Sequence, residues 1–395
     1  MNTITPVYLN HAGIICALGA NLAEVERKVF NDTGEHPCLS FSERYSPGEA
    51  LPLGLVNQAL ADTPLPDENT RNNRMLAAAL TPLLGEIETL KACHGRHRIG
   101  IVIGTSTSGI AACEAALHYD TAQGLQLDPG YTYLHQEFSA PARFLSRWLQ
   151  TSGPCWVLSS ACTSGAKALA AAARLLRLGV CDAVIAAGVD TLCRMTVSGF
   201  KALSVVSKTP CQPFSRNRCG INIGEGAACF ILSREPGQVC LAGIGESSDA
   251  YHISAPNPQG DGAILAMRQA LEQAQLAPEQ IDYLNLHGTA TPQNDAMEAL
   301  AVNQVLGANV PCSSTKPLTG HTLAAAGAIE ALFCWLLLRR EDATLPPHIW
   351  DKAYDPALAP LHAIGRRHAA QPARAVMSNS FAFGGNNLSL VMTRN

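Results

Sequence analysis

The chain has 395 residues, of which 47% are hydrophobic and only 15% are charged, and its formal net charge is −4. This length predicts two domains or two fused halves, and the shortage of charge indicates a large buried core together with an oligomer interface. The slightly acidic balance argues against nucleic-acid binding, which requires a basic patch.

The N-terminal stretch MNTITPVYLNHAGIICALG has no basic segment followed by an uninterrupted apolar run, so it does not predict a signal peptide. The longest apolar stretch, residues 327–338, contains Glu330 and is too short to cross a bilayer. We therefore predict a cytoplasmic protein with no membrane partner. Its 14 cysteines are scattered and form no CxxC pair, a pattern that predicts buried reduced thiols and neither a disulfide framework nor a metal site.

Short apolar runs alternate with helical patterns along the chain. The predicted strands are residues 99–104, 155–159, 183–188, 228–232 and 283–287. The predicted helices are residues 163–178, 263–275, 295–306 and 322–340. This alternation indicates an α/β fold with a largely parallel sheet. The REPG sequence at 234–237 gives the best division, into an N-terminal half of residues 1–236 and a C-terminal half of residues 237–395.

The segment SSACTSG, residues 159–165, follows a predicted strand and precedes the predicted helix 163–178. Cys162 is therefore expected at the helix N-terminus, where unpaired N–H groups and the helix dipole favour thiolate over thiol. The same N–H groups are suited to hold an oxyanion. A purely structural cysteine at a strand-to-helix turn remains the alternative at this point.

Two further segments place histidines beside predicted strand or helix ends. His287 opens the loop of NLHGTATPQND after a strand, and ligands of α/β folds bind at such strand ends. In SSTKPLTGHTLAAAG, Lys316 precedes His321, which lies before a long helix. The helix terminus and the lysine charge are both expected to lower the pKa of His321 and keep its ring neutral. A structural role remains the alternative for both residues: His287 as a histidine at a strand end, and His321 as part of a turn that caps the helix.

The last segment with a distinctive pattern is SNSFAFGGNN, residues 378–387. Phe383 is followed at once by two glycines, which allow a loop backbone to approach a ligand closely. An aromatic core anchor beside a tight turn is the alternative for this segment.

Together, SSACTSG, HGTATPQND, TKPLTGH and NSFAFGGNN resemble, in this order and spacing, the motif set of the β-ketoacyl-acyl-carrier-protein synthases I and II of the thiolase superfamily. The segment PFSRNRCGINIGEGAACFIL, residues 213–232, is also similar to a family segment that ends in GEGA. The resemblance covers most of the chain. It implies two similar halves in a five-layer α-β-α-β-α sandwich that dimerises.

The resemblance also implies roles for individual residues. Cys162 corresponds to the nucleophile, and His287 and His321 correspond to the pair that hydrogen-bonds a malonyl thioester during decarboxylation. Lys316 corresponds to the lysine that tunes the site, with Glu298 as the acid of its hydrogen-bond network. Phe383 corresponds to a gate residue that also contributes to the oxyanion hole. Thr289 and Thr291 correspond to contacts with the phosphopantetheine arm, and Thr107 corresponds to a residue of the acyl pocket.

What the resemblance implies is a decarboxylative condensation with substrates carried on the phosphopantetheine arm of an acyl carrier protein and with no permanently bound cofactor or metal. The chain departs from the family pattern at Ser215, where Asp is usual, and at Asn386, where Thr is usual. These departures favour a specialised type II polyketide or aryl-polyene pathway over housekeeping fatty-acid synthesis. The expected partner is a second copy of the chain or a subunit that resembles a chain-length factor.

Three other functions share part of this residue pattern. A thiolase uses a second cysteine near the C-terminus, whereas the last cysteine here is Cys334. A non-catalytic chain-length factor loses the nucleophile, which is present here as Cys162. A cysteine hydrolase needs one Cys and one His, and two histidines with a lysine fit decarboxylation better.

Overall fold

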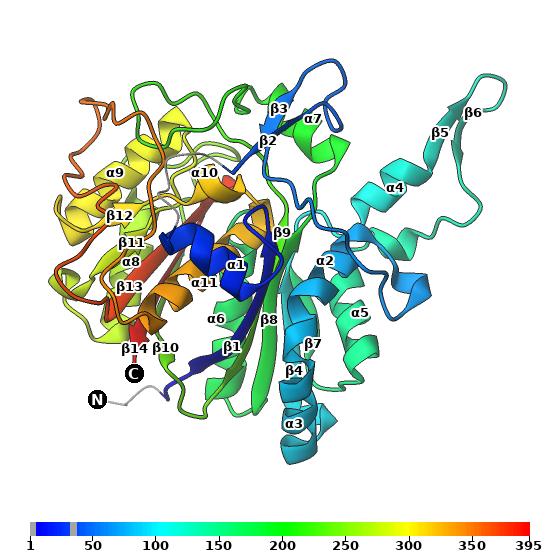
Figure 1. The fold of residues 1–395 in the computed structure, drawn as a ribbon, viewed down its shortest axis with the longest axis horizontal. Coiled ribbons are helices and arrows are strands. Elements are labelled where there is room, and N and C mark those ends of the chain that lie inside the picture. The colour runs from blue at the N-terminus through cyan, green and yellow to red at the C-terminus, as the bar shows by residue number, and fades with distance from the viewer. Residues whose placement is uncertain (1–4, 32–37) are drawn as a thin grey trace.

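The computed structural model describes residues 5–31 and 38–395. Its main sheet has ten strands in the order β12-β11-β13-β14-β10-β1-β9-β8-β4-β7 (Figure 1). One half of this order is built from strands of the first part of the chain, β1 Tyr8–Cys16, β4 Ile99–Gly104, β7 Cys155–Leu158, β8 Ala183–Asp190 and β9 Gly226–Ser233. The other half comes from the second part, β10 Val239–Ser248, β11 Tyr283–Asn285, β12 Cys312–Ser313, β13 Ala375–Ala382 and β14 Asn386–Arg394.

The prediction of a largely parallel sheet is wrong, because the sheet is mixed. Strand β4 runs parallel to β7 and β8, and β11 runs parallel to β12 and β13. The pairs β1·β9, β8·β9, β1·β10, β10·β14 and β13·β14 are antiparallel. The tight turn Phe383–Gly385 joins β13 directly to β14, and a turn this short permits only antiparallel pairing.

Helices form three layers around the two halves of the sheet. The central layer is α6 (Ser164–Arg177) and α11 (Ala326–Arg339), which touch each other, with α11 contacting β8 and β9 of one half and β13 and β14 of the other. The outer layer on the first half contains α2 (Arg71–Leu80), α3 (Leu84–His94) and α5 (Ala140–Leu149). The outer layer on the second half contains α8 (Asp261–Ala274) and α9 (Pro292–Leu306).

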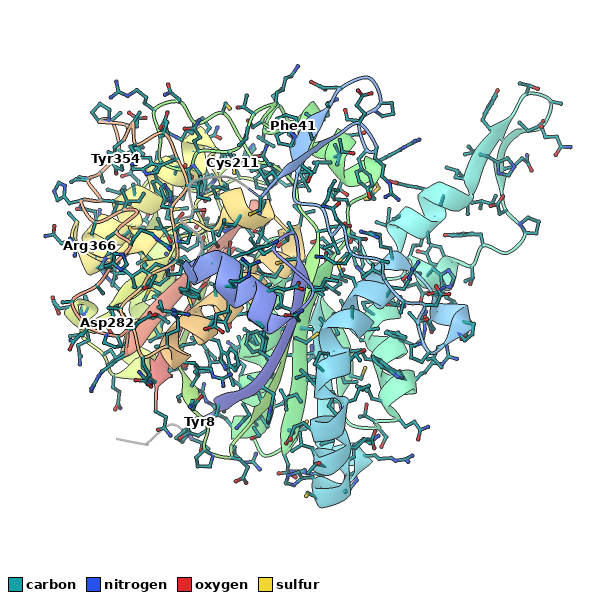
Figure 2. All side chains as sticks on the ribbon, in the orientation of Figure 1. Tyr8, Phe41, Cys211, Asp282, Tyr354 and Arg366 are labelled. Carbon is teal, nitrogen blue, oxygen red and sulfur yellow. The ribbon has the colours of Figure 1, made fainter. Side chains whose placement is uncertain are left out.

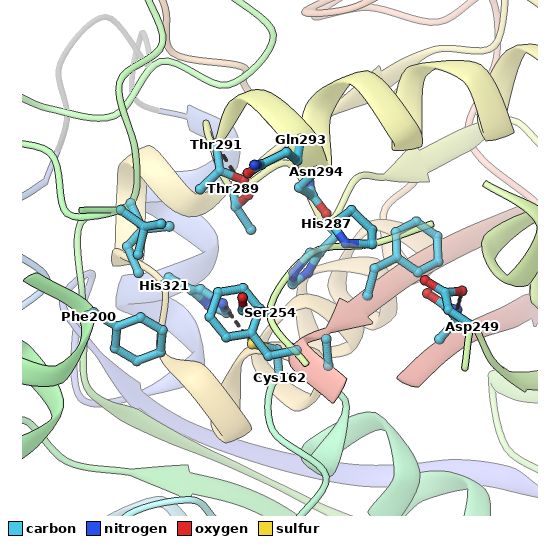
Figure 3. Close-up of a pocket in the computed structure, with 17 residues that line it drawn as sticks. Cys162, Phe200, Asp249, Ser254, His287, Thr289, Thr291, Gln293, Asn294 and His321 are labelled. Carbon is cyan, nitrogen blue, oxygen red and sulfur yellow. Dashed lines mark hydrogen bonds between the residues drawn. The ribbon is translucent and has the colours of Figure 1, made fainter. Parts of the chain in front are cut away.

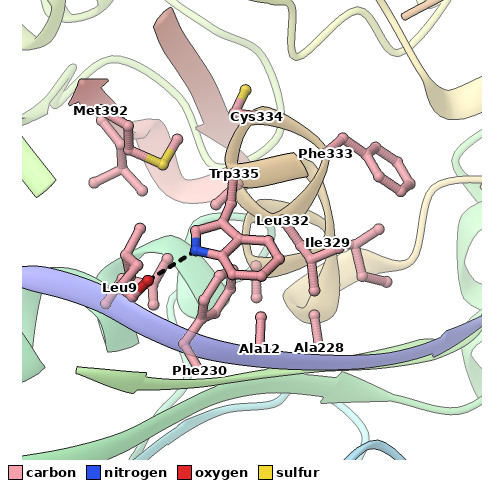
Figure 4. Close-up of a cluster of buried hydrophobic side chains, with 14 of the residues drawn as sticks. Leu9, Ala12, Ala228, Phe230, Ile329, Leu332, Phe333, Cys334, Trp335 and Met392 are labelled. Carbon is pink, nitrogen blue, oxygen red and sulfur yellow. Dashed lines mark hydrogen bonds between the residues drawn. The ribbon is translucent and has the colours of Figure 1, made fainter. Parts of the chain in front are cut away.

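The hydrophobic core follows this layering. The largest cluster of buried side chains surrounds α6 and α11, and separate clusters lie under the two outer helix layers. Helix α11 is buried on every side, so its apolar residues show no amphipathic stripe. Its Trp335 donates an indole hydrogen bond of 2.8 Å to the carbonyl of Leu9 on β1, which satisfies the polar end of a buried ring (Figure 4).

The remaining elements are short. They are helices α1 Leu22–Glu26, α4 Ile110–Ala116, α7 Arg194–Ala202 and α10 Lys316–Thr319, the hairpins β2 Ser40–Ser42 with β3 Leu51–Leu53 and β5 Leu117–Asp120 with β6 Gly124–Leu127, the π-helix Arg27–Asn31, and the 3₁₀ turns Pro66–Glu68, Thr81–Leu83, Arg96–Arg98, Tyr133–His135, Pro278–Gln280, Leu323–Ala325 and Phe383–Gly385. The β5–β6 hairpin stands away from the body of the molecule (Figure 1). Phe41 on β2, 61% exposed, lies at the molecular edge (Figure 2). Within the described residues, none of the helices has the length and apolar character needed to cross a membrane.

Candidate active site

Cys162 lies in a strained turn between β7 and α6. The preceding residue, Ala161, has a φ of +51°, a conformation that side chains disfavour, and its carbonyl accepts hydrogen bonds from the N–H and hydroxyl of Ser164. The turn brings Cys162 to the position before Thr163, the N-cap of α6, so it lies at the helix N-terminus as the sequence predicted. The thiol is nearly buried and 8% of the residue is exposed.

His321 and His287 converge on this sulfur from the other half of the chain (Figure 3). The Nε2 atom of His321 lies 3.1 Å from Cys162 Sγ. The rings of His287 and His321 are 5.4 Å apart, centre to centre, and meet edge to face. The donor atoms of all three residues lie within 4.8 Å of one another. Residues far apart in the sequence therefore share one small space.

The neighbours of His287 assign the proton on its ring. Lys316 Nζ donates to His287 Nδ1 at 3.4 Å and also to the carbonyl of His287. A neutral imidazole that accepts at Nδ1 carries its proton on Nε2. His287 therefore presents an N–H donor to the cavity, which suits a developing oxyanion and not a metal cation.

Both imidazoles are neutral at physiological pH. Burial, the charge of Lys316 and the neighbouring His321 lower the pKa of His287 well below 6.5. Burial and Lys316 lower the pKa of His321 in the same way. The sequence predicted this direction for His321 and its link to Lys316, although burial makes the largest contribution.

The prediction that Cys162 rests as a thiolate is wrong. Burial raises the pKa of the Cys162 thiol from 9.0 to about 12, with Lys316 lowering it and Glu330 and Asp190 raising it. A helix N-terminus contributes about 0.3–1 kcal/mol, less than the cost of removing a thiolate from water. The resting group is therefore a thiol, and His321 Nε2 is the base within reach of its proton.

Lys316 is balanced by Glu330, a residue that the sequence analysis did not assign to the site. Lys316 Nζ donates to Glu330 Oε1 at 2.5 Å, and both side chains are almost fully buried. Glu330 lies in the apolar helix α11. A lone charge in such a helix needs a partner, and this was the signal available in the sequence.

Glu298 is connected to Lys316 through the backbone of His287. No hydrogen bond joins Glu298 to Lys316 among the described residues; its carboxylate accepts instead from the backbone N–H groups of His287 and Gly288, each at 2.7 Å. Burial raises the pKa of Glu298 to about 7. Glu298 on α9 thus fixes the backbone of His287, whose carbonyl accepts from Lys316.

A cavity opens beside the three residues, and three of the predicted contacts, Thr289, Thr291 and Phe383, line it (Figure 3). Thr289 and Thr291 lie on its wall with their hydroxyls 2.9 Å apart. Phe383 lines it from the β13–β14 turn and packs against Phe200 at 5.9 Å between ring centres. Cys162 and Phe383 border the same space, as an oxyanion hole built from their N–H groups requires.

Besides Lys316 and Glu298, three residues singled out from the sequence lie outside the lining of this cavity. Thr107 is fully buried, and its N–H and hydroxyl donate to Asp190, so its contact with an acyl chain stays a prediction. Ser215 is buried and donates to Asp351 at 2.8 Å. Asn386 accepts from Lys167 at 3.2 Å.

Comparison with known families now decides the class of protein. The model of the β-ketoacyl synthase N-terminal domain matches residues 47–237, and that of the C-terminal domain matches residues 239–350. The chain belongs to the β-ketoacyl synthase family. It is thus an acyltransferase, and the family resemblance drawn from its motifs is confirmed.

Curated relatives agree. The chain is 32% identical over 318 residues to the 3-oxoacyl-[acyl-carrier-protein] synthase 2 of Coxiella burnetii, an alignment that covers 75% of each protein. It is 33% identical over 312 residues to the enzyme of the same name from Staphylococcus aureus, covering 74% of this chain and 76% of the relative.

Solved structures of β-ketoacyl synthases have the same fold. A ketosynthase in complex with its chain length factor from Xenorhabdus doucetiae is 41% identical, with a TM-score of 0.89, and the match covers 100% of this chain and 99% of that one. A β-ketoacyl synthase from Burkholderia phymatum is 26% identical, with a TM-score of 0.85 and coverage of 99% and 100%. The predicted thiolase-like fold is confirmed.

Proposed function

We propose that this β-ketoacyl synthase condenses a malonyl group with a Cys162-bound acyl chain, both delivered on the phosphopantetheine arm of an acyl carrier protein. The observation that carries the proposal is the convergence of Cys162, His287 and His321, with the sulfur 3.1 Å from His321 Nε2. A thiol beside a neutral imidazole serves acyl transfer, and neutral N–H donors serve enolate formation.

In the first half-reaction Cys162 Sγ attacks the carbonyl carbon of an acyl thioester. Its proton passes to His321 Nε2 as the S–C bond forms, since the resting group is a thiol. The carrier thiolate leaves and takes up this proton. The products are acyl-Cys162 and a free carrier thiol, and the N–H groups of Cys162 and Phe383 are proposed to hold the oxyanion between them.

In the second half-reaction a malonyl thioester enters and its carboxylate leaves as carbon dioxide. The electron pair of the broken C–C bond forms an enolate, whose oxygen accepts hydrogen bonds from His287 Nε2–H and from His321, which faces no thiol proton once Cys162 is acylated and donates as its Nε2–H tautomer. The α-carbon then attacks the carbonyl carbon of acyl-Cys162, the C–S bond breaks, and the sulfur leaves as a thiolate that takes up a proton from water. Both rings are neutral, so each carries one N–H that can donate to the enolate.

The remaining predicted residues are assigned positioning and binding roles. We propose that Lys316 keeps the proton of His287 on Nε2, and that Glu298 fixes the backbone at His287. The hydroxyls of Thr289 and Thr291 on the cavity wall are proposed to bind the phosphopantetheine arm. Phe383 is proposed to gate the passage to Cys162 from the turn between β13 and β14. We also propose the division at residues 236 and 237, which lie in the connection between β9 and β10.

We propose a specialised type II polyketide or aryl-polyene pathway, with a same-fold partner subunit of the chain-length-factor kind or a second copy of the chain. The identity of 41% to a ketosynthase that is complexed with its chain length factor supports this choice over fatty-acid synthesis. The projecting β5–β6 hairpin supports a partner, because its side chains extend into open space (Figure 2). Tyr119 and Leu125 are 74% and 64% exposed, which is costly in a monomer.

Carbon dioxide release from malonyl-carrier protein tests this function. We expect release by the enzyme in the presence of an acyl-carrier donor, with one β-ketoacyl product formed for each carbon dioxide. The Cys162→Ala variant should form no condensation product while still releasing carbon dioxide. No release by the wild-type chain, alone or with its partner subunit, would favour a passive subunit or a hydrolase.

A further inference from the structure

Asp190, the last residue of β8, is a fully buried carboxylate below the turn that follows His321. Its Oδ2 atom accepts a hydrogen bond of 2.8 Å from the N–H of Ala324. Ala324 lies in the 3₁₀ turn Leu323–Ala325 that leads into α11. The carboxylate therefore caps the helix start that carries His321 into the site.

The other oxygen of Asp190 holds the loop that follows β4. Its Oδ1 atom accepts from the hydroxyl of Thr105 at 2.8 Å, from the N–H of Ser106 at 2.8 Å, and from both the N–H and the hydroxyl of Thr107 at 2.9 Å. Among the described residues no Lys or Arg forms an ion pair with it. A buried carboxylate without a cation depends on such hydrogen bonds, so these contacts constrain one another.

The ring of His321 has few other restraints. Its Nε2 atom faces Cys162 Sγ, and its Nδ1 atom is buried without a hydrogen-bond partner in the part of the chain that the structure describes. The position of the ring is therefore set by its backbone. That backbone is held at His321 itself by Asn222 and Gly224, and at the following turn by Asp190 through Ala324.

Glycines let this turn sit directly on the neighbouring elements. A Cβ atom at Gly165 of α6 would lie 2.7 Å from the carbonyl oxygen of Ala324, and one at Gly188 of β8 would lie 3.0 Å from Ala325 Cα. Contacts this close pack the turn directly against α6 and β8, so we expect a change at Asp190 to be felt along the whole turn.

We propose that Asp190 is a positioning residue for the condensation, which ties the His321 turn and the β4 loop to one carboxylate and so keeps His321 Nε2 within reach of Cys162 Sγ. The inference rests on the proposed function for its effect on turnover. It adds a residue that touches neither substrate nor sulfur. The same carboxylate also raises the pKa of Cys162, whose other charged neighbours are Lys316 and Glu330.

The test compares Asp190→Asn with Asp182→Asn. The amide retains the shape of the carboxylate but places an NH₂ against donors on one side, so the turn shifts. We expect the kcat of malonyl-carrier decarboxylation to fall roughly 10- to 100-fold with KM little changed, as for other small displacements of a catalytic group. Asp182 lies just before the other end of β8, where it binds Arg98 and Arg234, and its variant should retain kcat.

A second readout does not depend on turnover. Removing the charge of Asp190 should lower the pKa of the Cys162 thiol, so alkylation of Cys162 should reach a given rate at a lower pH in Asp190→Asn. Slower turnover together with a more readily ionised thiol is the combination expected of the folded Asp190→Asn variant, and Asp182→Asn should show neither change. If the wild-type chain released no carbon dioxide, this shift would still decide whether Asp190 acts on the site.

A folded Asp190→Asn variant with wild-type kcat would overturn the proposal, as would an equal loss in Asp182→Asn. If Asp190→Asn does not fold, the Thr105→Val variant tests the proposal in its place. This change removes the hydrogen bond from Thr105 to Oδ1 and the one that Thr105 accepts from the N–H of Ser108, and it leaves the Ala324 contact in place. We expect kcat to fall between about 2- and 10-fold, the range of a lost buried hydrogen bond, and an unchanged kcat would contradict the proposal.

Discussion

At the scale of single residues, the site is a balance of buried charges that keeps its reacting groups neutral. Lys316 and Glu330 offset each other, and the lysine also donates to His287. Burial then sets the protonation of the other groups: it lowers the pKa of both histidines and raises that of Cys162. Before substrate binds, the thiol and both imidazoles are neutral, so the buried site holds no unpaired charge.

The thiol of Cys162 makes a testable prediction about pH. Because its pKa is raised from 9.0 to about 12, the thiolate fraction should keep growing as the pH rises through 9. We expect alkylation of Cys162 by iodoacetamide, followed by peptide mass spectrometry, to accelerate about tenfold per pH unit across this range. The exposed Cys219 serves as an internal control for reagent and unfolding. A plateau well below pH 9 would show that the helix terminus overcomes burial.

At the scale of elements, the sequence predicted those segments whose local pattern matches their environment. The strands at 99–104 and 183–188 and the helix at 163–178 correspond to β4, β8 and α6 within two residues at each end. Strands β1 and β13 were missed because polar residues interrupt them, among them His11, Asn379 and Ser380. Their pairing is set by distant strands, and Asn379 is satisfied by Ser389 of β14, a contact no local pattern reveals.

In the site, too, the residues with a local sequence pattern were predicted, and those positioned only by tertiary packing were not. Cys162, His287, His321 and Lys316 each lie in a motif at a predicted element end, and the structure brings them together. The ion-pair partner of Lys316, Glu330 of α11, was not predicted because pairing of a buried charge depends on tertiary packing. Asp190 carried no signal in the sequence, since its partners come from the loop after β4 and from the turn after His321.

The close contact between α6 and the His321 turn gives a prediction at this scale. In Gly165→Ala the new methyl group would lie 2.7 Å from the carbonyl oxygen of Ala324 and 2.9 Å from the N–H nitrogen of Ala328. We expect urea unfolding to show a loss of about 1–3 kcal/mol, the usual cost of overpacking. Gly199→Ala in α7 is the matched control, because its methyl group meets nothing within 4 Å and should be neutral or stabilising. Equal stability of the two variants would show that the helices have room to separate.

At the scale of the whole molecule, five layers bury the long α11 helix between the two halves of the sheet and bring both halves to one cavity. The segment around β5 and β6 does not take part in this packing. It carries exposed apolar side chains, among them Leu117, Tyr119, Leu125 and Leu127. A partner subunit of the same fold accounts for a projecting apolar hairpin better than solvent does.

Substitution on this hairpin tests the partner. Leu125→Asp, measured by light scattering on a size-exclusion column, should shift the mass from dimer to monomer, since a charge at the centre of an apolar contact is left unpaired. Ile253→Asp is the control, because Ile253 is 79% exposed on a different segment of the chain. A dimer that survives Leu125→Asp as fully as it survives Ile253→Asp would place the interface elsewhere.

The most direct test of the central claim is the mass of the protein after incubation with an acyl-loaded carrier protein in the absence of malonyl-carrier protein. The account predicts a single acyl increment, located on Cys162 by peptide mapping, which disappears when malonyl-carrier protein is added and is absent from Cys162→Ala. An acyl group on another residue, or condensation by Cys162→Ala, would contradict it.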